Sequence, residues 1–151
     1  MRILIVEDDD NKSKQISQCL LYNWKDCDII IKKSYQSGIK EISNEISNQI
    51  YDLILLDMSM PTYDITPTEP GGRLRLFGGE DILREMKRKK INGKAIVVTQ
   101  YDSFGEGETT LEELDVRLNK QFPLIYLGLV YYSASISNWA DDLEQLINSN
   151  F

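Results

Sequence analysis

Five short runs of apolar residues, rich in isoleucine, leucine and valine, recur along this chain, and a segment with helical periodicity follows each run. Short, continuous apolar runs are typical of strands that are buried on both faces, as in a parallel sheet. The alternation predicts an α/β fold, a doubly wound (βα)5 sandwich with right-handed crossovers and helices on both sides of the sheet. The predicted strands span residues 3–6, 29–31, 53–56, 95–98 and 124–130.

The segments between these runs carry apolar residues three or four positions apart, which is the spacing of one helix face. We interpret each of these stripes as a helix face that packs on the sheet. Asp10 or Asn11, in the polar cluster before the first stripe, is expected to cap the first helix. The stripes are Ile16, Cys19, Leu20 and Trp24; Ile39, Ile42, Ile46 and Ile50; Ile82, Leu83 and Met86; Leu111, Leu114 and Leu118; and Trp139, Leu143, Leu146 and Ile147.

The length and the charge of the chain limit its organisation and its partners. Its 151 residues, of which 42% are hydrophobic, fit one globular domain over residues 1–151. With 17 basic and 24 acidic residues the formal net charge is −7, which disfavours direct binding to nucleic acid. The chain has no histidine, which excludes a histidine base, nucleophile or metal ligand.

Cysteine content and hydrophobic segments indicate the cellular compartment. Cys19 and Cys27 are too few for a disulfide framework or a zinc ribbon, and we expect both to be reduced thiols. The first apolar run is too short for a signal peptide, and no stretch reaches the ~18 apolar residues of a membrane span. We therefore expect a soluble, cytoplasmic protein that does not interact with membranes.

Two irregular segments interrupt the alternation of strands and helices. Residues 62–79 contain Pro67, Pro70 and four glycines, which predicts a long loop inserted after the third strand. A second loose segment, residues 102–107, follows the fourth strand. Both segments lie after the carboxyl ends of strands, where open α/β sheets bind their ligands.

Polar side chains stand at the ends of three predicted strands: Glu7 and Asp8 after the first, Asp57 after the third and Thr99 at the fourth. The carboxyl ends of parallel strands share one edge of the sheet, so these side chains are expected to lie close together. Carboxylates at such short range repel one another unless a cation lies between them, and carboxylates with water and a phosphoryl group suit Mg²⁺. The cluster predicts a magnesium site with an aspartate as phosphoryl acceptor. The simpler interpretation is that these acidic residues cap the following helices.

The chain resembles the receiver domain of two-component response regulators, the CheY-like superfamily. The resemblance is carried by residues 3–9 (ILIVEDD), 52–61 (DLILLDMSMP) and 96–99 (IVVT), and the order of elements agrees along the whole chain. It implies a flavodoxin-like, five-stranded parallel sheet with the strand order 2-1-3-4-5. Because the chain ends where the fifth helix is expected, the resemblance also implies a receiver that acts alone, without an output domain.

The resemblance implies a role for each matching residue. Asp57 matches the phosphoacceptor, while Glu7 and Asp8 match the acidic pair that holds Mg²⁺. Ser59 stands where the family uses a backbone carbonyl as a further metal ligand. Thr99 matches the hydroxyl that bonds the phosphoryl oxygen and repositions the fourth and fifth elements.

The function that the resemblance implies is phosphorelay signal transduction. A histidine kinase or a phosphotransfer protein donates the phosphoryl group, and the phosphorylated receiver binds a protein target that the sequence does not name. Receivers often pair as homodimers through the fourth and fifth elements, and this fifth strand is apolar enough to allow it. The implied chemistry is no more than slow, Mg²⁺-dependent self-phosphorylation and autodephosphorylation.

The sequence departs from the family at the end of the fifth strand, where receivers place a lysine that bonds the phosphoryl group. Here the position falls on Tyr131 or Tyr132, whose neutral hydroxyl cannot supply that charge. Lys120 precedes the strand and is expected at the opposite end of the sheet. Arg73 or Arg75 of the inserted loop is a second possible source of the charge, since arginine binds phosphate well. The simpler interpretation is that both arginines are solvated or contact a partner.

Two further hypotheses about function stay open at this point. Without the lysine, the chain also fits a pseudo-receiver, a binding module with the fold and the acidic pocket but without regulation by phosphorylation. Gln100 replaces a usually small residue, and it could block a partner or orient a water. The third hypothesis is a small Mg²⁺-dependent phosphohydrolase, but such enzymes use an aspartate two positions after the nucleophile, where this chain has Ser59.

Overall fold

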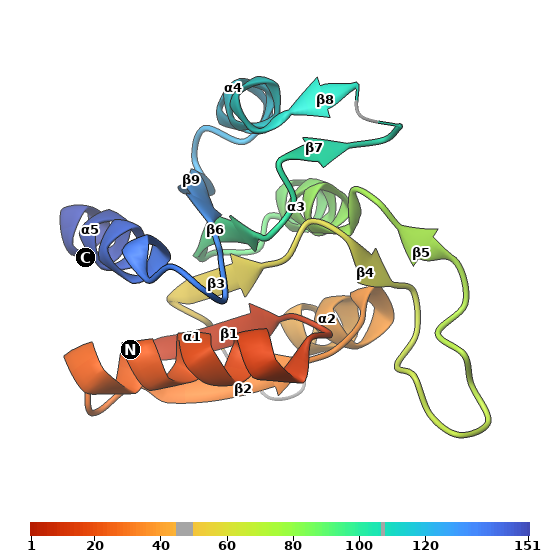
Figure 1. Cartoon of the computed structure of the whole chain (residues 1–151), viewed down its shortest axis with the longest axis horizontal. Coiled ribbons are helices and arrows are strands. Elements are labelled where there is room, and N and C mark those ends of the chain that lie inside the picture. The colour runs from red at the N-terminus through yellow and green to blue at the C-terminus, as the bar shows by residue number, and fades with distance from the viewer. Residues whose placement is uncertain (45–49, 107) are drawn as a thin grey trace.

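A five-stranded parallel sheet forms the centre of the computed structural model, which describes residues 1–44, 50–106 and 108–151 (Figure 1). The strands lie in the order β2-β1-β3-β6-β9. This is the expected 2-1-3-4-5 order of the five parallel strands, so the predicted α/β sandwich is confirmed. The strands are β1 (Arg2–Val6), β2 (Asp28–Lys32), β3 (Leu53–Leu56), β6 (Lys94–Thr99) and β9 (Tyr126–Tyr131).

Helices cover both faces of this sheet (Figure 1). Helices α1 and α5 pack on one face, and α2, α3 and α4 pack on the other. Among the described residues, no helix is both long enough and apolar enough to cross a membrane. The helices are α1 (Asp10–Asn23), α2 (Tyr35–Ile42), α3 (Gly78–Lys89), α4 (Leu111–Gln121) and α5 (Asn138–Asn150).

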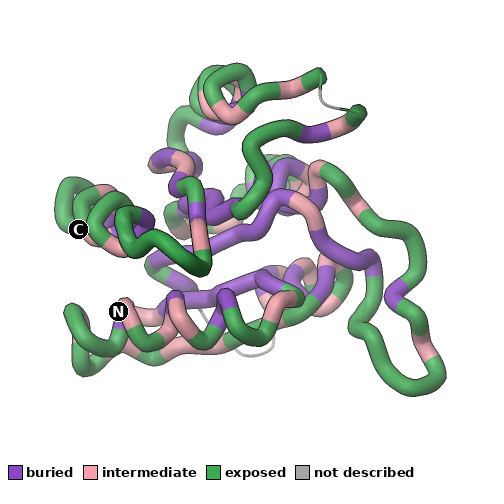
Figure 2. The backbone as a smooth tube through the Cα atoms, in the orientation of Figure 1, coloured by how far each residue is buried: buried purple, intermediate pink, exposed green. Residues whose placement is uncertain are grey.

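The central strands are apolar at every position because each strand contributes to two cores. In β1, Leu4 and Val6 pack toward α2, α3 and α4, whereas Ile3 and Ile5 pack toward α1 and α5. The buried trace in Figure 2 follows the central strands, with exposed segments on the outer sides of the helices. Burial on both faces removes apolar surface from water. Each Å² of buried apolar surface contributes about 25 cal/mol to the free energy of unfolding, and this is the main stabilising contribution to such a sheet.

The segment inserted after β3 is more regular than the loop that the sequence predicts. The strand β4 (Met60–Pro61) pairs antiparallel with β5 (Leu74–Arg75), and α3 already begins at Gly78. Next to this pair, the amides of Thr62 and Tyr63 donate to the carbonyls of Arg73 and Gly71, which continues the ribbon toward its tip. The irregular part is therefore shorter than the predicted range of 62–79.

A second ribbon follows β6, where only a loose segment is predicted. It consists of β7 (Ser103–Phe104) and β8 (Thr109–Thr110), which pair antiparallel and lead directly into α4. Phe104 is buried and its ring lies 6.0 Å from that of Phe77. The two ribbons thus extend the fold beside the carboxyl edge of the sheet.

Two predicted boundaries differ from the structure. The fifth strand starts at Tyr126 because the amides of Ile125 and Tyr126 donate to the carbonyl of Phe122, which makes a turn after α4. Helix α2 ends at Ile42, so Ile50 of the second predicted stripe lies outside the helix and is exposed, and Ile46 lies outside the described residues.

Candidate functional site

The first two acidic strand ends meet at the carboxyl edge of the sheet. In the parallel pairing of β1 with β3, Val6 lies opposite Leu56, so Glu7 and Asp57 are the residues that directly follow paired positions. The amide of Asp57 donates to the carbonyl of Val6 at 3.0 Å, which fixes the two segments together. Glu7, Asp8 and Asp57 each offer a carboxylate oxygen, all within 4.8 Å of one another. The structure therefore brings together the three carboxylates that the sequence predicts to lie close.

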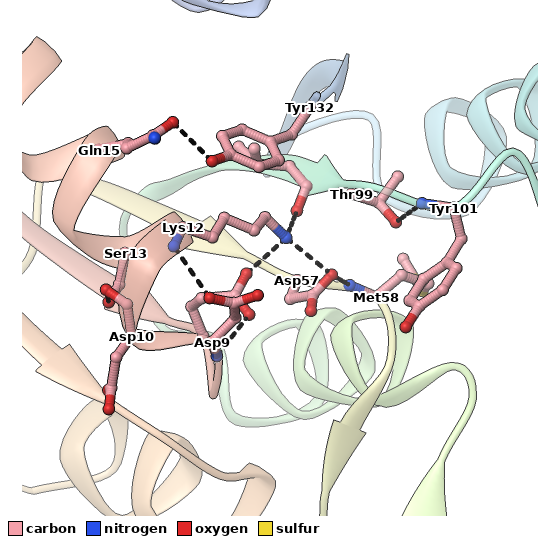
Figure 3. A network of polar contacts seen from close by, with 12 residues as sticks. Asp9, Asp10, Lys12, Ser13, Gln15, Asp57, Met58, Thr99, Tyr101 and Tyr132 are labelled. Atoms are coloured by element: carbon pink, nitrogen blue, oxygen red, sulfur yellow. Dashed lines mark hydrogen bonds and ion pairs between the residues drawn. The ribbon is translucent and has the colours of Figure 1, made fainter. Parts of the chain in front are cut away.

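A lysine that the sequence analysis did not single out lies among these carboxylates (Figure 3). The Lys12 Nζ atom is 2.5 Å from Oε2 of Glu7 and 3.2 Å from Oδ1 of Asp57. It also donates to the backbone carbonyl of Val98 at 2.8 Å. Lys12 is only 1% exposed, and lysines are rarely buried this completely unless their charge is paired.

The start of α1 explains how Lys12 reaches the site. Asp9 is the N-cap, and its carboxylate accepts the backbone N–H of Lys12. The prediction of Asp10 or Asn11 as the cap is therefore wrong by one or two positions, because the turn after β1 is already closed by the amide of Asp9 on Glu7 Oε1 at 3.0 Å. Helical side chains point back toward the N-terminus, so a lysine in the first turn is directed at the strand ends.

Burial dominates the titration of the two buried carboxylates. Loss of solvent, with the charge of Asp57 added, raises the pKa of Glu7 to about 8, although Lys12 opposes the shift. Burial likewise raises the pKa of Asp57, and the charge of Lys12 offsets part of that effect. For Lys12, burial favours the neutral form, but the charges of Asp57 and Glu7 outweigh it and raise the pKa. Lys12 therefore stays protonated, and its single positive charge does not fully compensate the two buried carboxylates.

Of Tyr131 and Tyr132, the two positions considered for the strand lysine of the family, Tyr132 is the one that lies beside Lys12. The ring centroid of Tyr132 lies 5.7 Å from Lys12 Nζ, and its hydroxyl donates to Gln15 Oε1 on α1 at 2.6 Å. Tyr131, the other candidate position, pairs with Thr99 and is half-exposed. The strand therefore offers an aromatic ring at this place, and α1 offers the ammonium group (Figure 3).

None of the cations considered from the sequence lies at the carboxylates. Arg75 stacks on the ring of Tyr35 at 3.7 Å and is 3.3 Å from Asp81. Arg73 is exposed on the ribbon, and Lys120 is exposed in the last turn of α4, before the chain enters β9 at the amino edge of the sheet. The sequence feature that could have identified Lys12 as a site residue is its position in the first turn of a helix, directly after an acidic strand end.

The remaining predicted residues border the acidic cluster in different ways. Thr99 is fully buried at the end of β6, and its hydroxyl accepts the amide of Tyr101 at 3.3 Å. Ser59 lies beside the cluster, and its hydroxyl donates to the carbonyl of Leu76 at 3.0 Å. Gln100 is exposed and lines the same pocket.

That pocket has a volume of about 360 Å³ and lies over the carboxylates. Its lining combines acidic side chains with apolar side chains from the two ribbons and from the segments next to them. A pocket of this composition can hold a charged group beside apolar atoms. The apolar part of the lining consists of Leu74, Leu76, Tyr101 and Phe104.

The sequence is similar to a bacterial response regulatory protein, although no family model matches it. It is 31% identical over 146 residues to the Detocs response regulatory protein DtcB of Enterobacter cloacae (strain JD6301). The match covers 95% of this chain and 95% of that protein. The similarity thus extends over nearly the whole of both chains.

Two solved structures share the fold. The response regulator Rcp1 in its Mn²⁺-bound form gives a TM-score of 0.64 at 19% identity, covering 96% of this chain and 90% of that one. The response regulator protein TrrA of Thermotoga maritima, in complex with Mg²⁺-BeF, gives a TM-score of 0.58 at 20% identity, covering 96% and 97%. Both share with this chain the arrangement of strands and helices.

Proposed function

This chain belongs to the response regulator receiver family, and on that premise we propose that it accepts a phosphoryl group on Asp57 in an Mg²⁺-dependent phosphorelay. The observation that carries the proposal is the meeting of Glu7, Asp8 and Asp57 at the carboxyl edge of the sheet, under an open pocket. Asp57 follows β3 directly, which fixes its backbone, while its side chain faces the floor of the pocket.

The residues present fit a hard divalent cation. Glu7, Asp8 and Asp57 would hold it through their carboxylate oxygens, with the backbone carbonyl of Ser59 as a further ligand. When all three carboxylates are ionised, Lys12 neutralises one charge and leaves two, which is the charge of one Mg²⁺ ion. Bound there, Mg²⁺ lowers the electrostatic cost of bringing a phosphoryl group to an acidic edge.

The transfer itself uses one oxygen of Asp57. Lys12 and the amide of Met58 both contact Oδ1, so we assign the attack to Oδ2. The new bond joins this oxygen to phosphorus, and the bond that breaks joins phosphorus to a histidine nitrogen of the donor. The leaving imidazole keeps the electron pair of that bond, and the aspartate becomes an acyl phosphate.

The donor and the target are other molecules. The chain contains no histidine, so a phosphohistidine must come from a kinase or a phosphotransfer protein. The hydroxyl of Thr99 accepts the amide N–H of Tyr101 at 3.3 Å, and its own O–H can turn to donate to a phosphoryl oxygen on Asp57. We infer that this new hydrogen bond moves the segment after β6 and so changes the surface that a protein target contacts.

Acetyl phosphate provides the test, because it needs no partner protein. The chain is incubated with acetyl phosphate and Mg²⁺, and intact mass spectrometry measures the fraction that gains one phosphoryl group. We expect an adduct that disappears with EDTA and in Asp57→Asn, and that persists in the matched control Asp64→Asn, which changes an exposed aspartate of the inserted segment. A chain that forms no adduct under any of these conditions would instead support a pseudo-receiver.

A further inference from the structure

We propose that Lys12 of α1 binds the phosphoryl group on Asp57, in place of the lysine that receivers carry on their fifth strand. The inference deepens the proposed function and rests on it. Lys12 belongs to α1, whereas the family's lysine stands at the end of the fifth strand, so here the cation comes from a helix instead of a strand. The network around it is drawn in Figure 3.

The first argument is the position of the ammonium group. Lys12 Nζ lies between Glu7 and Asp57, at 2.5 Å and 3.2 Å from their oxygens, and the carbonyl of Val98 holds it at 2.8 Å. Its contact on Asp57 is with Oδ1, next to the oxygen to which we assign the attack. A phosphoryl group on Oδ2 therefore places its oxygens near an ammonium group that is already held in position.

The second argument is that a tyrosine, Tyr132, stands beside Lys12 at one of the two strand positions considered for the lysine of the family. The ring of Tyr132 occupies the space beside the ammonium group, with its centroid 5.7 Å from Lys12 Nζ. The ring is fixed by the hydroxyl contact with Gln15 and by Trp139, whose ring centroid is 5.1 Å away. Strand β9 thus provides a wall against which the helix lysine rests.

The third argument is that the placement of Lys12 is unfavourable for stability alone. A cation in the first turn of a helix opposes the helix dipole, and a buried ion pair often costs more in desolvation than it returns. Replacing Lys12 alone by an apolar residue would leave the buried carboxylates of Glu7 and Asp57 without their cation, so the lysine belongs with the acidic cluster. A fixed, desolvated cation is instead what transfer of a negatively charged group requires.

On phosphorylation, the negative charge that Lys12 faces passes from the carboxylate of Asp57 to the oxygens of the phosphoryl group. Asp57 loses its own negative charge when the bond to phosphorus forms, and the transferred group brings negative charge on its oxygens. The ammonium group keeps all its protons and exchanges its contact with Oδ1 for one with a phosphoryl oxygen. Because Lys12 is on α1, the change at Asp57 is transmitted to α1 and, through Gln15 and Tyr132, toward α5.

The experiment compares Lys12→Met with Lys14→Met, which removes an exposed lysine from the same helix. The rate of adduct formation with acetyl phosphate is measured by intact mass, and Mg²⁺ affinity is measured separately by titration calorimetry. A third variant, Lys12→Met with Tyr132→Lys, returns the cation to the strand position.

We expect Lys12→Met to form the adduct at least about tenfold more slowly, the effect of one lost charge-assisted hydrogen bond. The same variant should bind Mg²⁺ severalfold more tightly, because the carboxylates lose a competing cation. Lys14→Met should change neither quantity, and the added Tyr132→Lys should restore part of the rate. A loss of rate with a gain of metal affinity cannot arise from misfolding.

Three results would overturn the role of Lys12. One is an adduct in Lys12→Met that forms as fast as in the unchanged chain. Another is loss of Mg²⁺ binding together with loss of the adduct, which would show that Lys12 only holds the pocket together. The last is no recovery of rate with Tyr132→Lys. Absence of the adduct in the unchanged chain would instead count against phosphorylation of Asp57, which separates the two proposals.

Discussion

At the scale of single residues, the site is a balance between burial and charge. Glu7 and Asp57 are buried, and Asp8 is exposed, so the three carboxylates differ in how strongly they need a cation. Lys12 satisfies part of that need, and the raised pKa of Glu7 shows that part of it remains. A metal-free chain therefore compensates by holding a proton, and a metal-bound chain has no need to do so.

The first prediction concerns the dependence of stability on pH. Burial raises the pKa of Glu7 from 4.5 to about 8 in the folded chain, so the folded state retains a proton that the unfolded chain releases. Between these two values the folded state binds more protons, and the free energy of unfolding contributed by Glu7 falls as pH rises. Guanidinium unfolding in EDTA at about pH 5.5 and about pH 8 should show this fall, and Glu7→Gln should reduce it. Equal pH dependence in both chains would refute the assignment.

The second prediction separates Arg75 from the chemistry. Arg75 stacks on Tyr35 and contacts Asp81, so Arg75→Met should lower the free energy of unfolding by about 1 kcal/mol. The rate of adduct formation with acetyl phosphate should not change, because the guanidinium does not reach Asp57. Arg73→Met, at an exposed position two residues earlier, should alter neither quantity. A slower adduct in Arg75→Met alone would show that the ribbon takes part in phosphoryl binding.

At the scale of elements, the site depends on how closely α3 approaches β3. A Cβ atom added at Gly79 would lie 2.4 Å from the carbonyl oxygen of Asp57, in the backbone segment that carries the proposed acceptor. The amide of Gly79 donates to the carbonyl of Met58 at 3.1 Å, which locks the start of α3 onto the strand end. Helix α3 therefore positions the main chain of Asp57 and Met58 while it covers one face of the sheet.

The third prediction follows from this contact. Gly79→Ala should destabilise the chain by about 2 kcal/mol, because two backbone segments would have to separate. Gly128→Ala is the matched control: the atoms nearest to its Cβ would be the δ-methyl groups of the half-buried Leu146, at 3.0 Å and 3.1 Å, and this flexible side chain can move. Thermal or guanidinium unfolding measures both, and a cost for Gly128→Ala as large as for Gly79→Ala would contradict the account.

The elements differ in how well their sequence predicts them. The central strands are predicted well because burial on both faces leaves only apolar residues, as in β1 and β3. The ribbons β4–β5 and β7–β8 are not, since each strand has two residues and lies among glycines and polar residues. Lys12 looks like a surface lysine in its own helix, and only the packing of β6 and β9 against α1 buries it.

At the scale of the whole molecule, the two cores meet at the edge that carries the site. Helix α1 brings Lys12 from one face of the sheet, and α3 fixes the main chain of Asp57 from the other. The acidic cluster is thus coupled to both layers, and a change in its charge acts on the stability of the whole fold. The location of the cluster could be predicted from strand ends alone, whereas the source of its cation depends on tertiary packing.

The fourth prediction is that Mg²⁺ stabilises the folded chain. An ion that binds only the folded state raises the free energy of unfolding by mass action, so the midpoint of thermal unfolding should rise with Mg²⁺ concentration. The rise should be absent in a chain with Glu7→Gln and Asp8→Asn, which lacks two of the three charges. Sodium chloride at equal ionic strength controls for screening. The same rise in both chains would place the metal elsewhere.

The acceptor itself can be located in one measurement. The chain is treated with acetyl phosphate and Mg²⁺ and then reduced with borohydride, which converts an aspartyl phosphate into homoserine. Tandem mass spectrometry of its peptides then locates the homoserine. We expect homoserine at position 57, in the peptide that follows β3, and aspartate at positions 8, 9 and 10. Homoserine at any of those three positions, or aspartate retained at position 57, would contradict the assignment of Asp57 as the phosphoacceptor.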